Sequence, residues 1–361
     1  MSVDTVVVGA GQAGLAAARQ LQLAGISHRL LEASDRPGGS WRHYYDSLAL
    51  FSPARYSSLP GLVLGGDPDR YPLRDEVVEY LARYAETFQL PVEIRREVRS
   101  IRRASRGFEI ALADGETFET RSVIVASGAF GQPHWPAIEG ADTFRGTLLH
   151  SADYRSPAGM AGKRVVIVGG ANSAVQIGLE LSRVARVTLA TRRPIRFVPQ
   201  RLLGRDFHFW LRVTGLDRTR WLSDQSTPVL DDGRYRAAIR GGEPDQRAMF
   251  PGITPRGVRW TDGHEEPVDV LLFATGFRPR IPYLAGLDVS NPDGTLRQRN
   301  GIGELPGIFS VGLPRQRNFA SATLRGVGSD AAHVVRRLER YLATSAAAAG
   351  TGLGGTAVPC R

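Results

Sequence analysis

Two glycine-rich segments contain residues that could bind the phosphates of a nucleotide. They are GAGQAG at residues 9–14 and GGANSA at residues 169–174. In the first segment, Gly9 permits a tight turn, Gly11 lets the backbone approach a pyrophosphate, and Gly14 lets a helix pack closely on a strand. The positive end of that helix dipole would then face the phosphates. Two such segments in one chain predict two dinucleotide-binding sites.

Each segment lies between a run of β-branched residues and a run of helical composition. Residues 5–8 and 164–168 precede the two segments, and residues 15–21 and 175–181 follow them. Strand, phosphate loop and helix in this order are typical of the first unit of a dinucleotide-binding domain. The sequence therefore predicts an α/β fold with two Rossmann-like domains.

An acidic residue follows the first segment at a distance that suits a ribose. A short apolar run at residues 29–31 ends at Glu32, which lies 32 − 14 = 18 positions after Gly14. A carboxylate about 20 residues beyond the glycines commonly accepts hydrogen bonds from ribose hydroxyls. Glu32 is therefore the predicted ribose ligand of the first site.

The second segment departs from the pattern of the first. Ala171 replaces the middle glycine and Ala174 the last one. A phosphate should therefore lie slightly further from the backbone here. Gly169 and the start of the helix, with Asn172 and Ser173, remain available to bind it.

The strand predicted after the second segment ends in basic residues. It covers residues 187–190 and is followed by Arg192 and Arg193 instead of an acid. An arginine at this place pairs with a 2′-phosphate, whereas an acid would reject it. The sequence thus predicts NADPH rather than NADH, with solvated surface arginines as the alternative.

Residues 36–41, RPGGSW, resemble the loop that flavoproteins of the two-dinucleotide-domain superfamily place along FAD. The resemblance implies that the first segment holds FAD. The residues that it places at this cofactor are Gly9, Gly11, Gln12, Ala13, Gly14, Glu32, Ala33, Gly39, Ser40 and Trp41. The alternative interpretation is that Gly38 and Gly39 form only a turn and that Trp41 is a core aromatic.

The stretch FRGTLLHSADYR at residues 144–155 matches the pattern FxGxxxHxxxY. This resembles the fingerprint of flavin-containing monooxygenases, so the chain is identified as a member of the class B flavin-dependent monooxygenases. Baeyer-Villiger monooxygenases have tryptophan where this chain has Tyr154, which favours heteroatom oxygenation over insertion into ketones. The stretch is expected to link two domains, with Phe144 buried, Gly146 at a turn and His150 hydrogen-bonded across the hinge. Whether His150 also has a functional role stays open.

The resemblance extends over roughly residues 3–340. DSLALFSP at residues 46–53 looks like the short bacterial and plant YUCCA-type branch of the family. Residues at the ends of further predicted strands complete the implied cofactor contacts: Gly128, Thr275, Gly276 and Gly312.

The order of the motifs implies that one domain is inserted into the other. The FAD-binding domain would consist of residues 1–155 and 276–344, and the NADPH-binding domain of residues 156–275. Residues 345–361 are rich in alanine and glycine. A segment of this composition cannot bury a core, so it is expected to be disordered.

Composition excludes several functions. The chain has 361 residues, a formal net charge of +10 and a single cysteine, Cys360. Without a CxxC pair to relay electrons from flavin to a disulfide, the chemistry of thioredoxin reductase and glutathione reductase is excluded, and the dispersed histidines lack metal-binding spacing. The arginines are scattered, so nucleic acid is not an expected partner. With no apolar run of about 18 residues and no signal peptide, we expect a cytoplasmic protein without a membrane partner, and a homo-oligomer stays open.

The resemblance also implies a mechanism. NADPH reduces FAD, the reduced flavin reacts with O2 to form a hydroperoxide, and this oxygenates a small soft nucleophile such as an amine or a sulfide. No acid-base pair is required, so no catalytic residue is assigned. The candidates for the pocket wall are Trp41, Leu50, Phe51, Ser52, Asn172 and Ser173.

Two other functions would use the same cofactor sites. A cysteine-free NADPH-dependent reductase or oxidase of the ferredoxin-reductase-like kind would not stabilise the oxygen adduct and would not be expected to carry the motif at residues 144–155. A non-catalytic flavin-bound sensor would not be reduced by NADPH at a useful rate. The substrate is not identified by the sequence.

Overall fold

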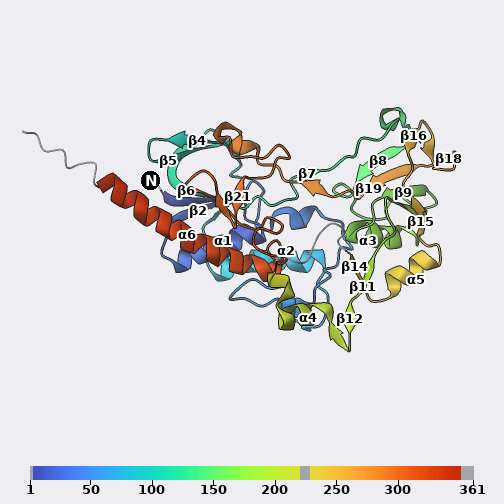
Figure 1. Ribbon diagram of the computed structural model, residues 1–361, viewed down its shortest axis with the longest axis horizontal. Helices are drawn as coiled ribbons and strands as arrows, with labels where there is room; N and C mark the ends of the chain where they lie inside the picture. Colours follow the sequence, from blue (N-terminus) through green and yellow to red (C-terminus); the bar gives the residue numbers. More distant parts are fainter. Residues whose placement is uncertain (1–2, 220–227, 351–361) are drawn as a thin grey trace, which may run out of the picture.

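The computed structural model describes residues 3–219 and 228–350. Its two largest sheets lie at opposite ends of the molecule, and the chain passes between them twice (Figure 1). The first glycine segment follows a strand of one sheet, and the second follows a strand of the other. The fold is α/β with two Rossmann-like units, as predicted.

The first sheet has nine strands. They are β1 (Val3–Val8), β2 (His28–Leu31), β3 (Val92–Glu93), β4 (Val98–Ala104), β5 (Gly107–Leu112), β6 (Thr117–Val125), β21 (Gln298–Arg299), β22 (Ile302–Gly303) and β23 (Ile308–Ser310). The order is β21-β22-β23-β6-β1-β2-β3, and β4 and β5 form an antiparallel branch beside β6. β23, β6, β1, β2 and β3 are parallel, with β1 at the centre of this group.

The second sheet has five parallel strands. They are β8 (Thr147–His150), β9 (Arg164–Val168), β10 (Arg186–Thr191), β15 (Asp245–Ala248) and β19 (Val270–Phe273). Their order is β15-β10-β9-β19-β8, so β9 lies at the centre. The second glycine segment follows β9 as the first follows β1. The two segments therefore occupy equivalent places in the two sheets.

The described part of the chain contains six α-helices. They are α1 (Gln12–Leu23), α2 (Arg74–Thr87), α3 (Asn172–Leu181), α4 (Phe207–Thr214), α5 (Arg234–Arg240) and α6 (Leu324–Gly350). α1 packs against α6 beside the first sheet, and α3 packs beside β10 and α5 in the second (Figure 1). No helix among residues 3–219 and 228–350 is both long enough and apolar enough to cross a membrane.

Shorter strands form small sheets. They are β7 (Gln132–Pro133) with β20 (Phe277–Arg278), β11 (Phe197–Pro199) with β14 (Val229–Asp231), β12 (Arg201–Leu202) with β13 (Arg205–Asp206), and the set β16 (Gly252–Thr254), β17 (Gly257–Arg259) and β18 (Glu265–Pro267). The antiparallel pair β7–β20 joins the two points at which the chain crosses between the large sheets.

Burial on both faces explains why β1 ends in three apolar residues, Val6, Val7 and Val8. Val7 packs into the core formed with α1 and α6, whereas Val6 and Val8 point to the opposite face and pack with Phe108 and Ile110 of β5. Side chains alternate between the two faces of a strand, so a central parallel strand covered on both sides needs apolar residues at every position.

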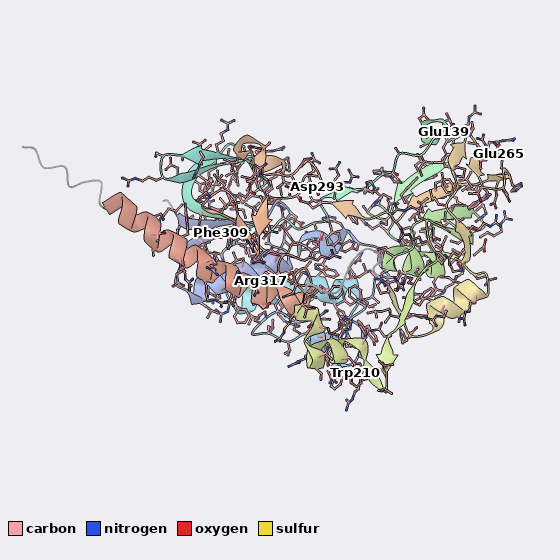
Figure 2. The ribbon with its side chains drawn as sticks, in the orientation of Figure 1. Glu139, Trp210, Glu265, Asp293, Phe309 and Arg317 are labelled. Atoms are coloured by element: carbon pink, nitrogen blue, oxygen red, sulfur yellow. The ribbon has the colours of Figure 1, made fainter. Side chains whose placement is uncertain are left out.

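The start of the second unit differs from the predicted boundary. β8 lies before residue 155, yet it pairs with β19 in the second sheet. Glu139 forms a bridge to Gly252 and lies with Glu265 at the outer end of this unit (Figure 2). We therefore propose that the inserted domain begins just after β7, near residue 135, and that the stretch 144–155 forms part of its sheet rather than a free linker.

The end of the chain also differs from its prediction. α6 continues to Gly350, so residues 345–350 of the predicted disordered tail are helical. Alanine has the highest helix propensity, and these residues extend a helix that is already nucleated and packed. Residues 351–361 lie outside the described part of the chain.

Candidate active site

One large cavity lies at the carboxyl ends of β1 and β9. Its volume is about 1540 Å³, which exceeds the range of about 300–1,000 Å³ for the site of one small ligand. All the predicted cofactor and pocket-wall residues line this cavity except Gly14 and Ala174. The structure therefore brings both predicted dinucleotide sites into one continuous space.

The first glycine segment is shaped by two contacts within the protein. A Cβ atom at Gly14 would lie 1.8 Å from the Gly9 carbonyl oxygen, and Gly9 has φ of +101° with Ala126 against it. A Cβ atom at Gly11 would meet only the Cα atom of Gly39, at 3.6 Å. Thus the fold itself requires glycine at positions 9 and 14, whereas Gly11 keeps space open on the cavity side.

The starts of α1 and α3 fit the phosphates of two dinucleotides. Gly11 and Ala171 are their N-cap residues, and neither helix has a side-chain cap. The first N–H groups of a helix lack partners within it and attract anions. Gly11, Gln12, Ala171 and Asn172 line the cavity, so the uncapped helix starts face it.

Glu32 lies in the cavity wall and also organises the first loop. Its Oε2 atom accepts a hydrogen bond from the Ala10 N–H at 2.7 Å, and Oε1 accepts from the Ser34 N–H and hydroxyl at 3.0 and 2.7 Å. The residue is only 7% exposed. A carboxylate has about four lone-pair sites, so one remains for a ribose hydroxyl.

Trp41 connects the loop after β2 to α1 and α6. Its Nε1 atom donates to Gln12 Oε1 at 3.0 Å, and Gln12 Nε2 donates to the carbonyl oxygen of Ala322 at 2.6 Å. These contacts hold the segment GSWRH (Gly39–His43) against the first phosphate loop.

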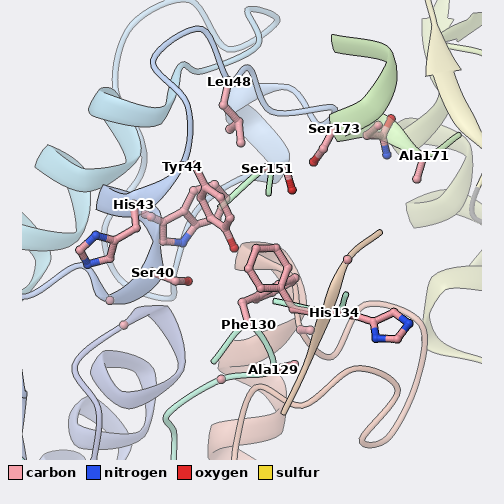
Figure 3. Close-up of a pocket in the computed structure, with 18 of the residues that line it drawn as sticks. Ser40, His43, Tyr44, Leu48, Ala129, Phe130, His134, Ser151, Ala171 and Ser173 are labelled. Carbon is pink, nitrogen blue, oxygen red and sulfur yellow. The ribbon is translucent and has the colours of Figure 1, made fainter. Parts of the chain in front are cut away.

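Aromatic rings form a row across the middle of the cavity. Trp41 lies edge-on to Tyr44, Tyr44 to Phe130, and Phe130 to Phe277, with ring centres 5.7, 6.1 and 5.5 Å apart. Figure 3 shows Tyr44 and Phe130 between Ser40 on the first unit and Ser173 on the second. The row supplies an apolar wall between the two predicted dinucleotide sites.

Cationic side chains line the part of the cavity beyond β10. Arg192 and Arg193 follow this strand directly, are exposed, and form no ion pair with another residue of the described part of the chain. His134 lies opposite, and burial together with Arg278 and Arg192 lowers its pKa. The arginines therefore keep their charges available for an anionic ligand.

The second glycine segment also meets a carbonyl group. Gly169 has φ of +144°, and a Cβ atom there would lie 2.5 Å from the Ala274 carbonyl oxygen. The hydroxyl group of Thr275 donates a hydrogen bond to the carbonyl oxygen of His134. The N–H group of His134 donates in turn to the carbonyl oxygen of Gly276 at 2.9 Å. These bonds join the two segments by which the chain crosses between the units, beside the second loop.

His150 is buried at the end of β8. Its Nδ1 atom accepts a hydrogen bond from the Ala152 N–H at 3.0 Å, which is a local contact. The ring contacts Trp135 and Phe277. Burial lowers the pKa of His150, and the nearby charge of Asp153 and the backbone of Gly276 only partly oppose this. Gly276 lies where the chain crosses between the two units, so a hydrogen bond of His150 across the hinge stays a prediction.

The buried histidines predict that the protein loses stability in mild acid. Burial also lowers the pKa of His208. An unfolded histidine takes up a proton near pH 6.5, whereas these folded ones resist it, so the unfolded state binds more protons below that pH. The melting temperature should fall between about pH 6.5 and 5, before carboxylates titrate.

A histidine variant tests this origin of the pH dependence. His150→Gln should flatten the fall of melting temperature over the same pH interval, and His264→Gln at an exposed position should leave it unchanged. A fall of equal slope in all three proteins would assign the acid sensitivity to other groups.

The rest of the stretch 144–155 ties the two units together. Phe144 is half-buried rather than fully buried, and its ring lies over Gly146, where a Cβ atom would approach it to 2.4 Å. Tyr154 is buried and donates to Glu180 Oε2 at 2.7 Å. Arg155 donates to the carbonyl oxygen of His43, which belongs to the first unit.

Several residues of the cavity wall were not predicted from the sequence. Except for Gln176, which follows the second glycine loop in α3, they come from segments outside both loops: His43, Tyr44, Tyr45, Leu48, Phe130, His134, Ser151, Gln176 and Tyr283. Tyr45 donates to Gln176 Oε1 of α3 at 3.1 Å, so part of this wall is an interface between the units. In the sequence, only the aromatic residues of HYY at 43–45, close to Trp41, could have indicated this part of the cavity wall.

Known proteins resemble this chain over nearly its whole length. The profile of the family described as pyridine nucleotide-disulphide oxidoreductase matches residues 6–231. The uncharacterized oxidoreductase CzcO-like of Geobacillus kaustophilus is 31% identical over 340 residues, which are 92% of this chain and 97% of that protein. The indole-3-pyruvate monooxygenase YUCCA1 of Oryza sativa subsp. japonica is 30% identical, covering 92% of this chain and 90% of the rice protein.

A solved structure shows similarity of the same extent. The flavin-containing monooxygenase from Stenotrophomonas maltophilia is 35% identical, with a TM-score of 0.84, over 94% of this chain and 99% of that one. These similarities include both sheets and both glycine loops, because they cover nearly the whole chain.

Proposed function

The chain belongs to the class B flavin-dependent monooxygenases, an oxidoreductase family that uses FAD and NADPH, and we propose that it oxygenates a small soft nucleophile such as an amine or a sulfide. Its other substrate is O2. We further propose that it acts in the cytoplasm, where NADPH is available.

The observation that carries this proposal is the single cavity shared by the two helix starts. FAD would lie on the first unit, with its pyrophosphate at Gly11 and Gln12 and a ribose at Glu32. NADPH would lie on the second, with its pyrophosphate at Asn172 and Ser173 and its 2′-phosphate between Arg192 and Arg193. When bound, this pair transfers two electrons from NADPH through FAD to O2.

The protein would contribute positioning and exclusion of water. No acid-base pair is assigned, because transfer of oxygen to a soft nucleophile requires none, and Trp41, Ser52 and Asn172 are candidates only for the pocket wall. The aromatic row of Trp41, Tyr44 and Phe130 would instead shield the reacting part of the flavin from solvent. Removing water from such a site favours oxygen transfer over wasteful release of peroxide.

The test compares product with peroxide. The FAD-loaded protein is given NADPH, ¹⁸O2 and a panel of amines, sulfides and ketones, and both labelled product and hydrogen peroxide are measured. We expect label in the products of amines or sulfides and NADPH consumption coupled to it. Peroxide without labelled product from any compound would support the reductase or oxidase interpretation, and labelled esters from ketones would overturn the heteroatom assignment.

Phe130 provides a variant that should separate the two outcomes. Phe130→Ala opens the aromatic row, so peroxide release per NADPH should rise several-fold while reduction of FAD by NADPH keeps its rate. Trp135→Ala is the matched control. Trp135 lies on the same crossing segment as Phe130 and is similarly exposed, at 46% against 49%. Unlike Phe130, Trp135 does not line the cavity. Equal coupling in both variants would contradict a shielding role for Phe130.

A further inference from the structure

A projection with an apolar tip extends from the lower edge of the molecule. It consists of residues 201–218, which form the hairpin β12–β13, helix α4 and the short helix Leu216–Arg218. In Figure 1, α4 and β12 lie below both large sheets, and Figure 2 shows Trp210 at this extremity. The cofactor sites do not use this projection, since none of its residues lines the cavity.

The projection exposes large apolar side chains at an unusual density. Leu203 is 82% exposed, the highest value for a large apolar residue in the described chain. Val213 is 65% exposed, Leu202 52% and Leu216 40%. Single exposed apolar residues are ordinary, but a group of them on one projecting element marks an interaction site.

Leu203 is also in a backbone conformation that disfavours leucine. Its φ is +49°, in the left-handed region, and Gly204 follows with φ of +73°. Hairpin turns of this kind usually contain asparagine, aspartate or glycine at both positions. Contacts within the described chain thus do not explain a leucine at this exposed, left-handed position.

Within residues 201–218 the exposed charges are all positive. Arg201, Arg205, Arg212 and Arg218 are exposed. Neither acid of the projection is exposed: Asp206 accepts hydrogen bonds from Tyr71, Gln200 and His208, and Asp217 accepts one from Arg325. The outer surface of residues 201–218 therefore carries arginines without an exposed carboxylate.

Buried contacts hold the projection rigidly on the first unit. Gln200 Nε2 donates to the Phe51 carbonyl oxygen at 3.0 Å and to Asp206 Oδ2 at 2.9 Å. The His208 ring stacks with the rings of Phe51 and Tyr56, each with its centre 6.2 Å away. The tip is thus presented by fixed structure and needs no rearrangement to make a contact.

We propose that this projection docks on the surface of an anionic phospholipid bilayer. The leucines would enter the boundary between headgroups and acyl chains, and the arginines would pair with lipid phosphates. Charge favours this occupant over a second copy of the chain, because a two-fold contact through the tip would bring like-charged arginines together. The proposal does not depend on the reaction that the enzyme catalyses.

Peripheral docking differs from the absence of a membrane partner expected from the sequence. That expectation rested on the lack of a long apolar run, which is a requirement for crossing a bilayer. A surface contact needs only a few apolar side chains combined with positive charge. The formal net charge of +10 adds attraction toward an anionic surface.

Vesicle sedimentation tests the proposal with the FAD-loaded protein. We expect binding to vesicles of phosphatidylglycerol and phosphatidylcholine at low salt, weaker binding at high salt, and little binding to phosphatidylcholine alone. Leu203→Glu should reduce binding at least tenfold, and Arg212→Gln combined with Arg218→Gln should do so about tenfold. Val63→Glu is the matched control, since Val63 is 76% exposed and lies outside the projection.

The rate at which NADPH reduces FAD is measured in every variant, and a rate equal to that of the wild-type protein would show that the fold is intact. The proposal is overturned if the wild-type protein does not bind anionic vesicles, or if Leu203→Glu and Val63→Glu bind equally well. It is also overturned if light scattering shows a dimer that Leu203→Glu dissociates while vesicle binding is unaffected, because the projection would then be a contact between two copies.

Discussion

Gly11→Ala is expected to give a folded protein that has lost FAD. Gly11 has φ of −74°, which alanine adopts freely, and its new Cβ atom would meet only Gly39, at the ordinary contact distance of 3.6 Å. The methyl group would instead fill the cavity side of the loop, where we propose that the pyrophosphate binds. Overpacking of this size costs about 1–3 kcal/mol, so FAD affinity should fall about tenfold to hundredfold, measured by titrating apoprotein with FAD.

Two further glycine variants control this experiment. In Gly14→Ala the new Cβ atom would lie 1.8 Å from the Gly9 carbonyl oxygen, so loss of thermal stability should accompany loss of FAD. In Gly65→Ala nothing lies within 4 Å, and both properties should be unchanged. If Gly11→Ala retains FAD with wild-type affinity, the cofactor does not approach the loop as proposed.

Replacing both Arg192 and Arg193 by alanine is expected to remove the preference for NADPH. Each arginine lines the cavity beside β10 and has no ion pair with a described residue that would compete for it. Hydrogen bonds to a charged group contribute about 1.5–3 kcal/mol each, so KM for NADPH should rise about tenfold to hundredfold or more. KM for NADH, which lacks the 2′-phosphate, should change less than about threefold.

Arg183→Ala provides the control for a loss of positive charge. Arg183 is exposed on the same unit at the end of α3 but does not line the cavity, so it should alter neither KM. Steady-state reduction of FAD by each nucleotide checks both variants. An equal rise of KM for NADPH and NADH in the double variant would mean that these arginines hold a part common to both nucleotides, such as the pyrophosphate.

Local sequence was sufficient for the parts of the fold that depend on neighbouring residues. A strand, a glycine loop and a helix are contiguous in the chain, so the places of Gly9, Gly14 and Gly169 follow from the residues beside them. β9 was predicted with the same bounds, Arg164–Val168, because a central parallel strand contains a continuous apolar run, here Val165–Val168. Net charge and cysteine content are likewise properties of the sequence alone.

The positions at which some strands and helices begin and end could not be predicted from the sequence. The stretch 144–155 was interpreted by its motif, and its strand β8 was missed because only Leu149 and His150 of that edge strand are shielded, which leaves no clear alternation. The helical residues 345–350 were missed because their composition is compatible with both disorder and helix, and the choice depends on the packed helix that precedes them.

Contacts between distant segments were decided only in the folded chain. Tyr44 and Phe130 are 86 positions apart, as 130 − 44 gives, yet their rings lie 6.1 Å from each other in the cavity wall. The exposed leucines of the projection at residues 201–218 could not be told from buried ones in the sequence. The sequence by itself determined the two cofactor loops, because the residues that would bind phosphate are consecutive in the chain. The tertiary structure decided the cavity wall and the exposed tip of the projection, because the burial of a side chain depends on what the rest of the chain covers.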